Sequence, residues 1–171
     1  TDQIKIEIIQ MDLQTITPVI SIRPSVLSLR SYFEGSLVPF INIMEGDYVN
    51  VTFRNPAPPF SILSTTTCYL DSTGAGEACT FGIPDGQPFF IQLNHRNSIE
   101  TWSSNPVMFN AKQSFYNFTM TPNSAFGMNL KQVGNRFCTF SGDVNQDGTI
   151  DGTDVGLIDN DAYNFATGYL N

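Results

Sequence analysis

The residues best suited to chemistry lie near the C-terminus, in the loop formed by residues 143–154. Asp143, Asn145 and Asp147 occupy alternate positions, so their side-chain oxygens can converge on one point, and Gly148 follows where the chain must turn sharply. The candidate ligands are Asp143, Asn145, Asp147, Thr149 through its backbone carbonyl, Asp151 and Asp154. Because Ca²⁺ prefers carboxylate, amide and carbonyl oxygens, this spacing predicts a calcium site.

The spacing fits the EF-hand calcium loop, with one departure at its last position. An EF-hand loop ends on a bidentate Glu, whereas this loop ends on Asp154. Ile150 stands where an apolar residue is expected to point into the core and anchor the loop. An Asp at the last position, followed by a short helix, resembles the type I dockerin repeat, which implies Ca²⁺ as the cofactor. A type I dockerin has two such repeats, whereas this chain has one. The cohesin-binding role of dockerins is therefore not carried over directly, and a cohesin-like protein stays one of several candidate partners.

A wider resemblance extends upstream of the loop. It is carried by the strings at residues 95–102 (HRNSIETW), 132–137 (QVGNRF) and 141–148 (SGDVNQDG). These strings look like C-terminal regions of large secreted or surface proteins of Bacteroidota and related bacteria, where a β-sandwich precedes dockerin-like repeats. The resemblance covers roughly residues 25–171. It implies an extracellular, cell-surface location in a bacterium, and it supplies no catalytic role to carry over to this chain.

Composition and charge exclude several classes of function. The net charge is −8, and residues 141–171 contain six Asp and no Lys or Arg, which argues against a nucleic-acid partner. One histidine, His95, and three cysteines are too few for a blue-copper or a four-cysteine zinc site. A Ser-His-Asp triad would have to use His95, and no nucleophile elbow accompanies it, so an enzyme is not expected. No apolar run approaches the roughly 18 residues of a membrane span.

The elements that must position the loop are short β-strands. Strand-like runs are found at residues 26–33, 48–54, 60–70, 77–81, 88–95, 99–102 and 114–120. Clusters of Gly, Pro, Asn and Asp separate them. This pattern predicts a mainly β fold, an immunoglobulin-like antiparallel β-sandwich, with a small barrel as the alternative. A short helical segment should follow within residues 151–170, with Thr153 as its cap and Asp161 capping a second turn.

The predicted organisation has three parts: an N-terminal arm (1–23), the sandwich (24–138) and the calcium-binding tail (139–171). The arm alternates apolar and polar residues around Ile4, Ile6 and Ile8, and no tight turn pairs it with a following strand. Such a strand must add to a sheet edge, either its own or that of a neighbouring copy. Head-to-tail addition to neighbours would produce an open fibre.

Cysteines and glycosylation sequons give further expectations. If a hairpin turn centres on residues 72–75, Cys68 and Cys79 face each other, which predicts a disulfide; two buried thiols are the alternative. Cys138 remains, either as a buried free thiol or as an intermolecular bridge. Asn50 and Asn117 begin sequons and are possible glycosylation sites.

The aromatic residues between the predicted turns have two interpretations. A sandwich core is the simpler one, and an exposed row that binds sugar rings is the other. The residues concerned are Phe89, Phe90, Phe109, Phe115, Tyr116 and Phe118. His95 and Trp102 are expected to be packed strand residues.

Two functions from different classes follow from these features. The first is a non-catalytic extracellular structural protein, a subunit of a surface fibre or pilus-like filament that assembles with copies of itself by strand donation and is stabilised by calcium. The alternative is a secreted carbohydrate- or protein-binding module anchored through its dockerin-like tail.

Overall fold

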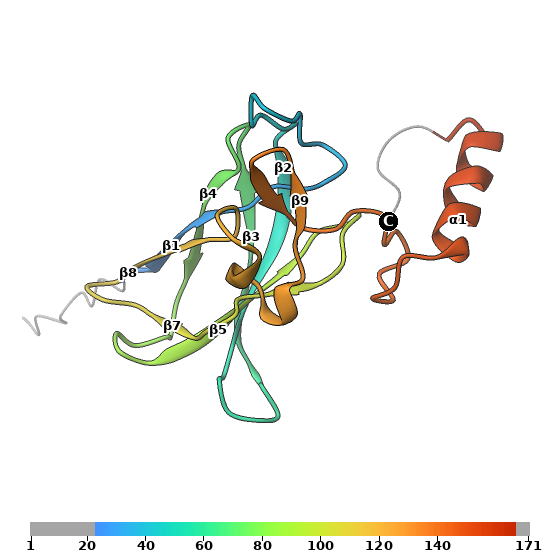
Figure 1. Ribbon diagram of the computed structural model, residues 1–171. Helices are drawn as coiled ribbons and strands as arrows, with labels where there is room; N and C mark the ends of the chain where they lie inside the picture. Colours follow the sequence, from blue (N-terminus) through green and yellow to red (C-terminus); the bar gives the residue numbers. More distant parts are fainter. Residues whose placement is uncertain (1–22, 167–171) are drawn as a thin grey trace, which may run out of the picture.

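The computed structural model describes residues 23–166, and the predicted arm therefore lies almost entirely outside the described residues (Figure 1). The strands are β1 (Ser25–Arg30), β2 (Asp47–Arg54), β3 (Ile62–Leu70), β4 (Ala75–Thr80), β5 (Pro88–Asn94), β6 (Thr101–Trp102), β7 (Val107–Met108), β8 (Gln113–Asn117), β9 (Lys131–Val133) and β10 (Arg136–Cys138). The helical elements are two 3₁₀ turns, η1 (Pro122–Ser124) and η2 (Phe126–Met128), and the helix α1 (Gly152–Tyr163).

The strands form three sheets within the described residues. One has the strand order β3-β2-β5-β6, with β7 pairing to the start of β5; the second has the order β4-β1-β8; and β9 and β10 form a separate pair. Most pairings are antiparallel, as predicted, but β1 and β8 run parallel, with Val26 opposite Gln113 and Arg30 opposite Asn117. The expectation of a purely antiparallel fold is therefore wrong at this pair, because a strand's distant partner is not encoded in its own alternation.

One hydrophobic core takes side chains from both larger sheets. Alternation places Leu27 and Leu29 of β1 inside, together with Phe89 and Ile91 of β5. Phe53 lies at the centre, with its ring centroid 5.1 Å from that of Phe89. The chain is thus mainly β, and two sheets sharing one core are consistent with a β-sandwich. The immunoglobulin-like topology stays a prediction.

The aromatic residues divide between the core and the surface. Phe89, Phe109 and Phe118 are buried, as the core interpretation predicts. Phe115 is 65% exposed on the outer face of β8. Phe115 is therefore not a core residue, because the adjacent residues Ser114 and Tyr116 take the inward face.

The tail contains α1, which stands apart from the sheets in Figure 1. Its N-cap is Asp151, not Thr153 as expected. The Asp151 side chain accepts from the N–H of Thr153, and the Asp154 side chain accepts from the N–H of Asp151, which forms a capping box. The helix continues to Tyr163 without a break, so Asp161 lies inside it and does not cap a second turn.

All three cysteines are free thiols in the structure. The turn between β3 and β4 closes with the N–H of Asp71 donating to the carbonyl oxygen of Ala75, over 2.8 Å. This register is one residue away from the one that would place Cys68 opposite Cys79. Because side chains alternate along a strand, Cys68 is buried while Cys79 is exposed. The predicted Cys68–Cys79 disulfide is not supported. Burial raises the pKa of the Cys138 thiol to about 12.

Candidate functional site

The first residue of the acidic loop, Asp143, binds the main chain in the middle of the loop. Asp143 is buried, and its two carboxylate oxygens accept hydrogen bonds from the main-chain N–H groups of Asp147 and Gly148, each over 3.1 Å. Gly148 has a φ of +87°, a left-handed conformation that glycine adopts without strain. The sharp turn expected at this position is therefore present.

The last candidate ligand, Asp154, is also buried and connects both ends of the loop. Its Oδ1 accepts from the N–H groups of Val144, over 2.8 Å, and Asn145, over 3.2 Å. Its Oδ2 accepts from the N–H of Asp151, over 2.9 Å. The N–H groups of Asp151, Asn145 and Val144 hold the pKa of Asp154 below its usual value, so this group stays an anion.

The candidate ligands in the middle of the loop face one another. Asn145 donates from Nδ2 to Asp147 Oδ2 over 2.8 Å, and Asn145 Oδ1 accepts from the Asp147 N–H over 2.9 Å. Asp147 Oδ1 accepts from the N–H of Thr149. Asp151 is used by the helix cap, where its Oδ1 accepts from the N–H and hydroxyl of Thr153.

The candidate donor atoms suit a hard cation, but their side chains are not arranged as a preformed metal-coordination site. The candidate ligands are all oxygens, and residues 141–171 contain no Lys or Arg to balance their charge. Within residues 23–166, no group of three or more His, Cys, Asp or Glu side chains is close enough together to hold a metal ion. Ile150 is 44% exposed and lies against Gly142, so its predicted core position is wrong. Calcium at this loop stays a prediction.

The loop is joined to the sheets at the turn formed by residues 95–99. The N–H of Gly142 donates to the carbonyl oxygen of Asn97 over 2.9 Å, and the N–H of Ile99 donates to that of Phe140 over 3.0 Å. Gln146 reaches back from the loop, donating to the carbonyl oxygens of Asp143 and, over 3.4 Å, Ser98. The loop and the turn therefore form one bonded unit.

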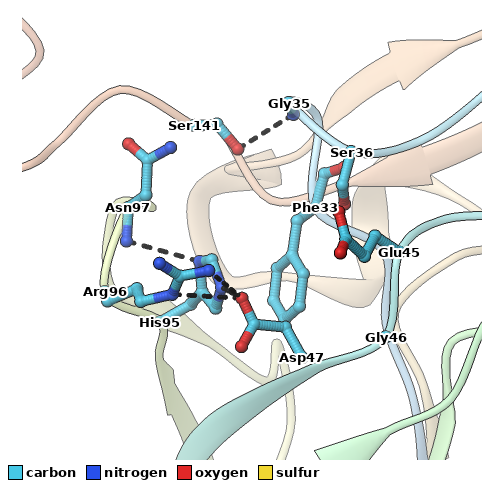
Figure 2. Close-up of a pocket in the computed structure, with 10 residues that line it drawn as sticks. All are labelled: Phe33, Gly35, Ser36, Glu45, Gly46, Asp47, His95, Arg96, Asn97 and Ser141. Carbon is cyan, nitrogen blue, oxygen red and sulfur yellow. Dashed lines mark hydrogen bonds and ion pairs between the residues drawn. The ribbon is translucent and has the colours of Figure 1, made fainter. Parts of the chain in front are cut away.

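His95 lies at the floor of a small pocket beside this junction (Figure 2). The pocket has a volume of about 160 Å³ and is lined by Phe33, Gly35, Ser36, Glu45, Gly46, Asp47, His95, Arg96, Asn97 and Ser141. The imidazole of His95 stacks on Phe33, with ring centroids 3.8 Å apart. The Asn97 N–H points at His95 Nδ1, over 3.3 Å, so Nδ1 accepts and Nε2 carries the proton. Nε2 then donates to Asp47 Oδ2, over 3.1 Å.

Asp47 and His95 perturb each other's titration. Burial favours a higher pKa for Asp47, but hydrogen bonds from Arg96 and His95 outweigh it and lower the pKa. Burial lowers the pKa of His95 below 6.5, although the nearby Asp47 acts in the opposite direction. The imidazole is therefore neutral at pH 7.

Asp47, His95 and Ser98 are connected in the order of a hydrolytic triad, since Ser98 Oγ lies 3.2 Å from His95 Nδ1. Ser98 is only 1% exposed, however, and Arg96 also binds Asp47 through two nitrogens. A substrate therefore has no open path to the hydroxyl, which favours a structural role for the network. The sequence does not reveal this contact, because Asp47 and His95 lie far apart along the chain.

The two sequons differ in their surroundings. Asn50 is exposed on β2, and its Oδ1 accepts from the Thr67 hydroxyl over 3.0 Å. Asn117 is half-buried, and its Oδ1 accepts from both the N–H and the hydroxyl of Thr119 over 2.8 Å. Asn50 is therefore the more accessible of the two predicted glycosylation sites.

Comparisons with known proteins give no match: no family model, no curated protein and no solved structure matches the chain. The resemblance to a dockerin repeat thus stays a prediction from the sequence. Over residues 23–166, no helix is both long and apolar enough to cross a membrane.

Proposed function

We propose that this chain is a non-catalytic structural subunit of an extracellular bacterial surface filament. The N-terminal arm of one copy adds as a strand to a sheet edge of the next copy, and calcium stiffens the tail. The observation that supports the proposal is the outer edge of β8 at Phe115 and Asn117, which pairs with no other strand within residues 23–166.

The main-chain bonds between β1 and β8 show which backbone groups of β8 face away from β1. The N–H of Val26 donates to the carbonyl oxygen of Lys112 over 2.8 Å, and the N–H of Phe118 donates to that of Arg30 over 2.9 Å. A parallel ladder uses alternate residues, so the N–H and C=O groups of Phe115 and Asn117 face away from β1. Among the described strands, β8 pairs only with β1. An edge of this kind is a template for an added strand.

The arm has the pattern that such an edge requires. Ile4, Ile6 and Ile8 alternate with polar residues, so one face of an added strand would be apolar. Because the arm directly precedes β1, a donated strand would extend from one subunit toward the next. Such a heterologous contact repeats without closing, which generates a filament.

Calcium acts on the other end of the subunit in this proposal. Asp143, Asn145, Asp147, the Thr149 carbonyl, Asp151 and Asp154 would supply the oxygen ligands. The loop is bonded to the turn at residues 95–99, so an ordered loop would hold α1 against the immunoglobulin-like sandwich as a half-dockerin tail.

A second candidate function is a secreted binding module, anchored through the same tail. The specific observation that favours it is an aromatic cavity on the outer face of β5 and β6, lined by Phe60, Phe90, Trp102, Ser103 and Phe126.

Truncation of the arm tests the filament proposal. The full chain and a variant lacking residues 1–22 would be followed by light scattering, with and without a synthetic peptide of residues 1–17. We expect the full chain to polymerise, the truncated variant to stay monomeric, and excess peptide to cap growth. Equal polymerisation of both chains would contradict the role of the arm.

A further inference from the structure

An aromatic cavity opens on the outer face of the larger sheet. Its volume is about 290 Å³, and it is lined by Phe60, Phe90, Trp102, Ser103 and Phe126. These residues come from the loop after β2, from β5, from β6 and its following residue, and from η2. Parts of the chain that are distant in sequence therefore build one concave surface.

The rings are held in fixed orientations. The ring centroid of Phe60 lies 6.0 Å from that of Trp102 at an interplanar angle of 82°, and 6.3 Å from that of Phe90 at 69°. The ring centroids of Phe90 and Trp102 are 6.2 Å apart, at an interplanar angle of 57°. Edge-to-face contacts of this kind are favourable and limit ring motion. The wall of the cavity formed by Phe60, Phe90 and Trp102 is thus preformed.

None of these rings belongs to the core. Phe89 and Ile91 point inward, so Phe90 between them points outward. Phe60 is 38% exposed and Phe126 is 70% exposed. Aromatic rings that gather at the surface and leave a hollow between them are typical of a binding site.

A row of fixed polar side chains runs from the cavity along β5. Gln92 is buried, accepts from Arg54 Nε over 2.6 Å, and donates to Glu100 Oε2 over 2.6 Å. Glu100 Oε2 also accepts from Asn94 Nδ2 over 3.1 Å, while Glu100 Oε1 accepts from the indole N–H of Trp102. Arg54 lies over the Trp102 ring, 5.4 Å from its centroid. The carboxylate, amides and guanidinium are therefore positioned beside the rings.

This combination matches the chemistry of a sugar. A pyranose ring has apolar C–H faces that pack on aromatic rings and a rim of hydroxyls that bond to planar amides and carboxylates. A purely apolar ligand would leave the polar row unused, and the net charge of −8 disfavours a nucleic acid. We propose that the outer face of β2, β5 and β6 is a saccharide-binding site, with Phe60, Phe90, Trp102 and Phe126 as its ring-stacking surface. This proposal gives the second candidate function its ligand class and is independent of filament formation.

A longer saccharide has room to extend beyond the cavity. A second hollow of about 310 Å³ begins at Asn94 and Glu100 and continues along the acidic loop past Asp143, Gln146, Asp147 and Gly148. Because Asn94 and Glu100 belong to both the polar row and this hollow, the hollow begins where the polar row ends. The site is therefore expected to bind oligosaccharides more tightly than monosaccharides.

Trp102 is the only tryptophan in the chain, so its fluorescence reports directly on the site. The full chain would be titrated with cellohexaose, chitohexaose and maltohexaose while Trp102 emission is recorded. We expect a saturable change with at least one of them. Phe126→Ala should weaken that binding by about tenfold, a loss of about 1.4 kcal/mol, because a stacking ring is removed. Phe115→Ala removes an equally exposed phenylalanine from the other sheet and should leave binding unchanged.

Two results would overturn the saccharide site. One is the absence of any saturable change with all three hexasaccharides. The other is a change produced by the synthetic peptide of residues 1–17 and not by the sugars, which would make the cavity an acceptor for the arm. Electron microscopy of the same samples separates this test from that of the filament, because sugar binding without filaments would support the site and contradict only the filament.

Discussion

The main-chain N–H of Gly142 donates to the carbonyl oxygen of Asn97 over 2.9 Å, and this bond joins the acidic loop to the turn that carries His95. Ser98 and Ser141 form an antiparallel bridge at the same place. Since His95 also binds Asp47 at the start of β2, the loop, the turn and the sheet are mechanically connected. Ordering or loosening the loop should therefore change the free energy of unfolding of the sheets.

The first prediction concerns calcium at the loop. Adding Ca²⁺ should raise the melting temperature of the full chain, because a ligand that binds the folded state stabilises it. Asp147→Asn should weaken calcium binding by about tenfold or more, since it removes one carboxylate charge and keeps an acceptor for the Thr149 N–H. Isothermal titration calorimetry measures both affinities.

Asp159→Asn is the matched control for the calcium experiment, because it removes an equal charge from an exposed position on α1. Its calcium affinity should equal that of the unmodified chain. Identical melting temperatures in calcium and in chelator would contradict calcium binding by the folded chain.

The second prediction concerns pH. The pKa of His95 in the folded chain lies below 6.5, so the unfolded chain takes up a proton first as the pH falls through 6.5, and stability decreases. The lowered pKa of Asp47 adds a further loss only at more acidic pH, below 3.8. His95→Gln should therefore flatten the dependence of the unfolding free energy on pH between neutral pH and the folded pKa of His95. Urea titrations at a series of pH values give this slope, and an unchanged slope would refute the assignment.

The third prediction concerns the β8 edge. Phe115→Pro removes an N–H that faces away from β1, so the subunit should keep its fold while losing the ability to receive a strand. Phe115→Ala removes the side chain and keeps the N–H, so it should still polymerise. Light scattering follows assembly and circular dichroism checks the fold. Filaments of normal length from the proline variant would exclude this edge.

The fourth prediction concerns the core. Phe53 is fully buried and contacts the rings of Phe89 and Phe109. Phe53→Ala should lower the free energy of unfolding by about 3–5 kcal/mol, because the truncation leaves a cavity. Phe115→Ala should change it by less than about 0.5 kcal/mol, as is usual for an exposed position. Urea denaturation compares the two, and equal losses would contradict the assigned core.

Local patterns in the sequence predict seven of the ten described strands, whereas β7, β9 and β10 lie outside the predicted runs. The alternation in residues 48–54 and 88–95 corresponds closely to β2 and β5. The candidate calcium ligands could be proposed because they lie within one continuous loop and their spacing is itself the signal. The spacing could not predict how these side chains are arranged, since the Asp151 carboxylate caps α1.

Contacts between distant residues could not be predicted in the same way. The parallel pairing of β1 and β8, the Asp47–His95 bond and the aromatic cavity all join separate parts of the chain. The Cys68–Cys79 disulfide is not supported for a related reason, because shifting the turn by one residue reverses the face on which a side chain lies. Sequence alternation fixes neither the partner of a strand nor the register of a turn.

The most direct test of the structural-subunit proposal is the solution mass and negative-stain appearance of the full chain, measured in calcium and again in chelator. We expect long filaments in calcium, with a mass far above the 18.9 kDa of one chain, that loosen when calcium is removed. A compact monomer in both conditions, even at high protein concentration, would contradict it.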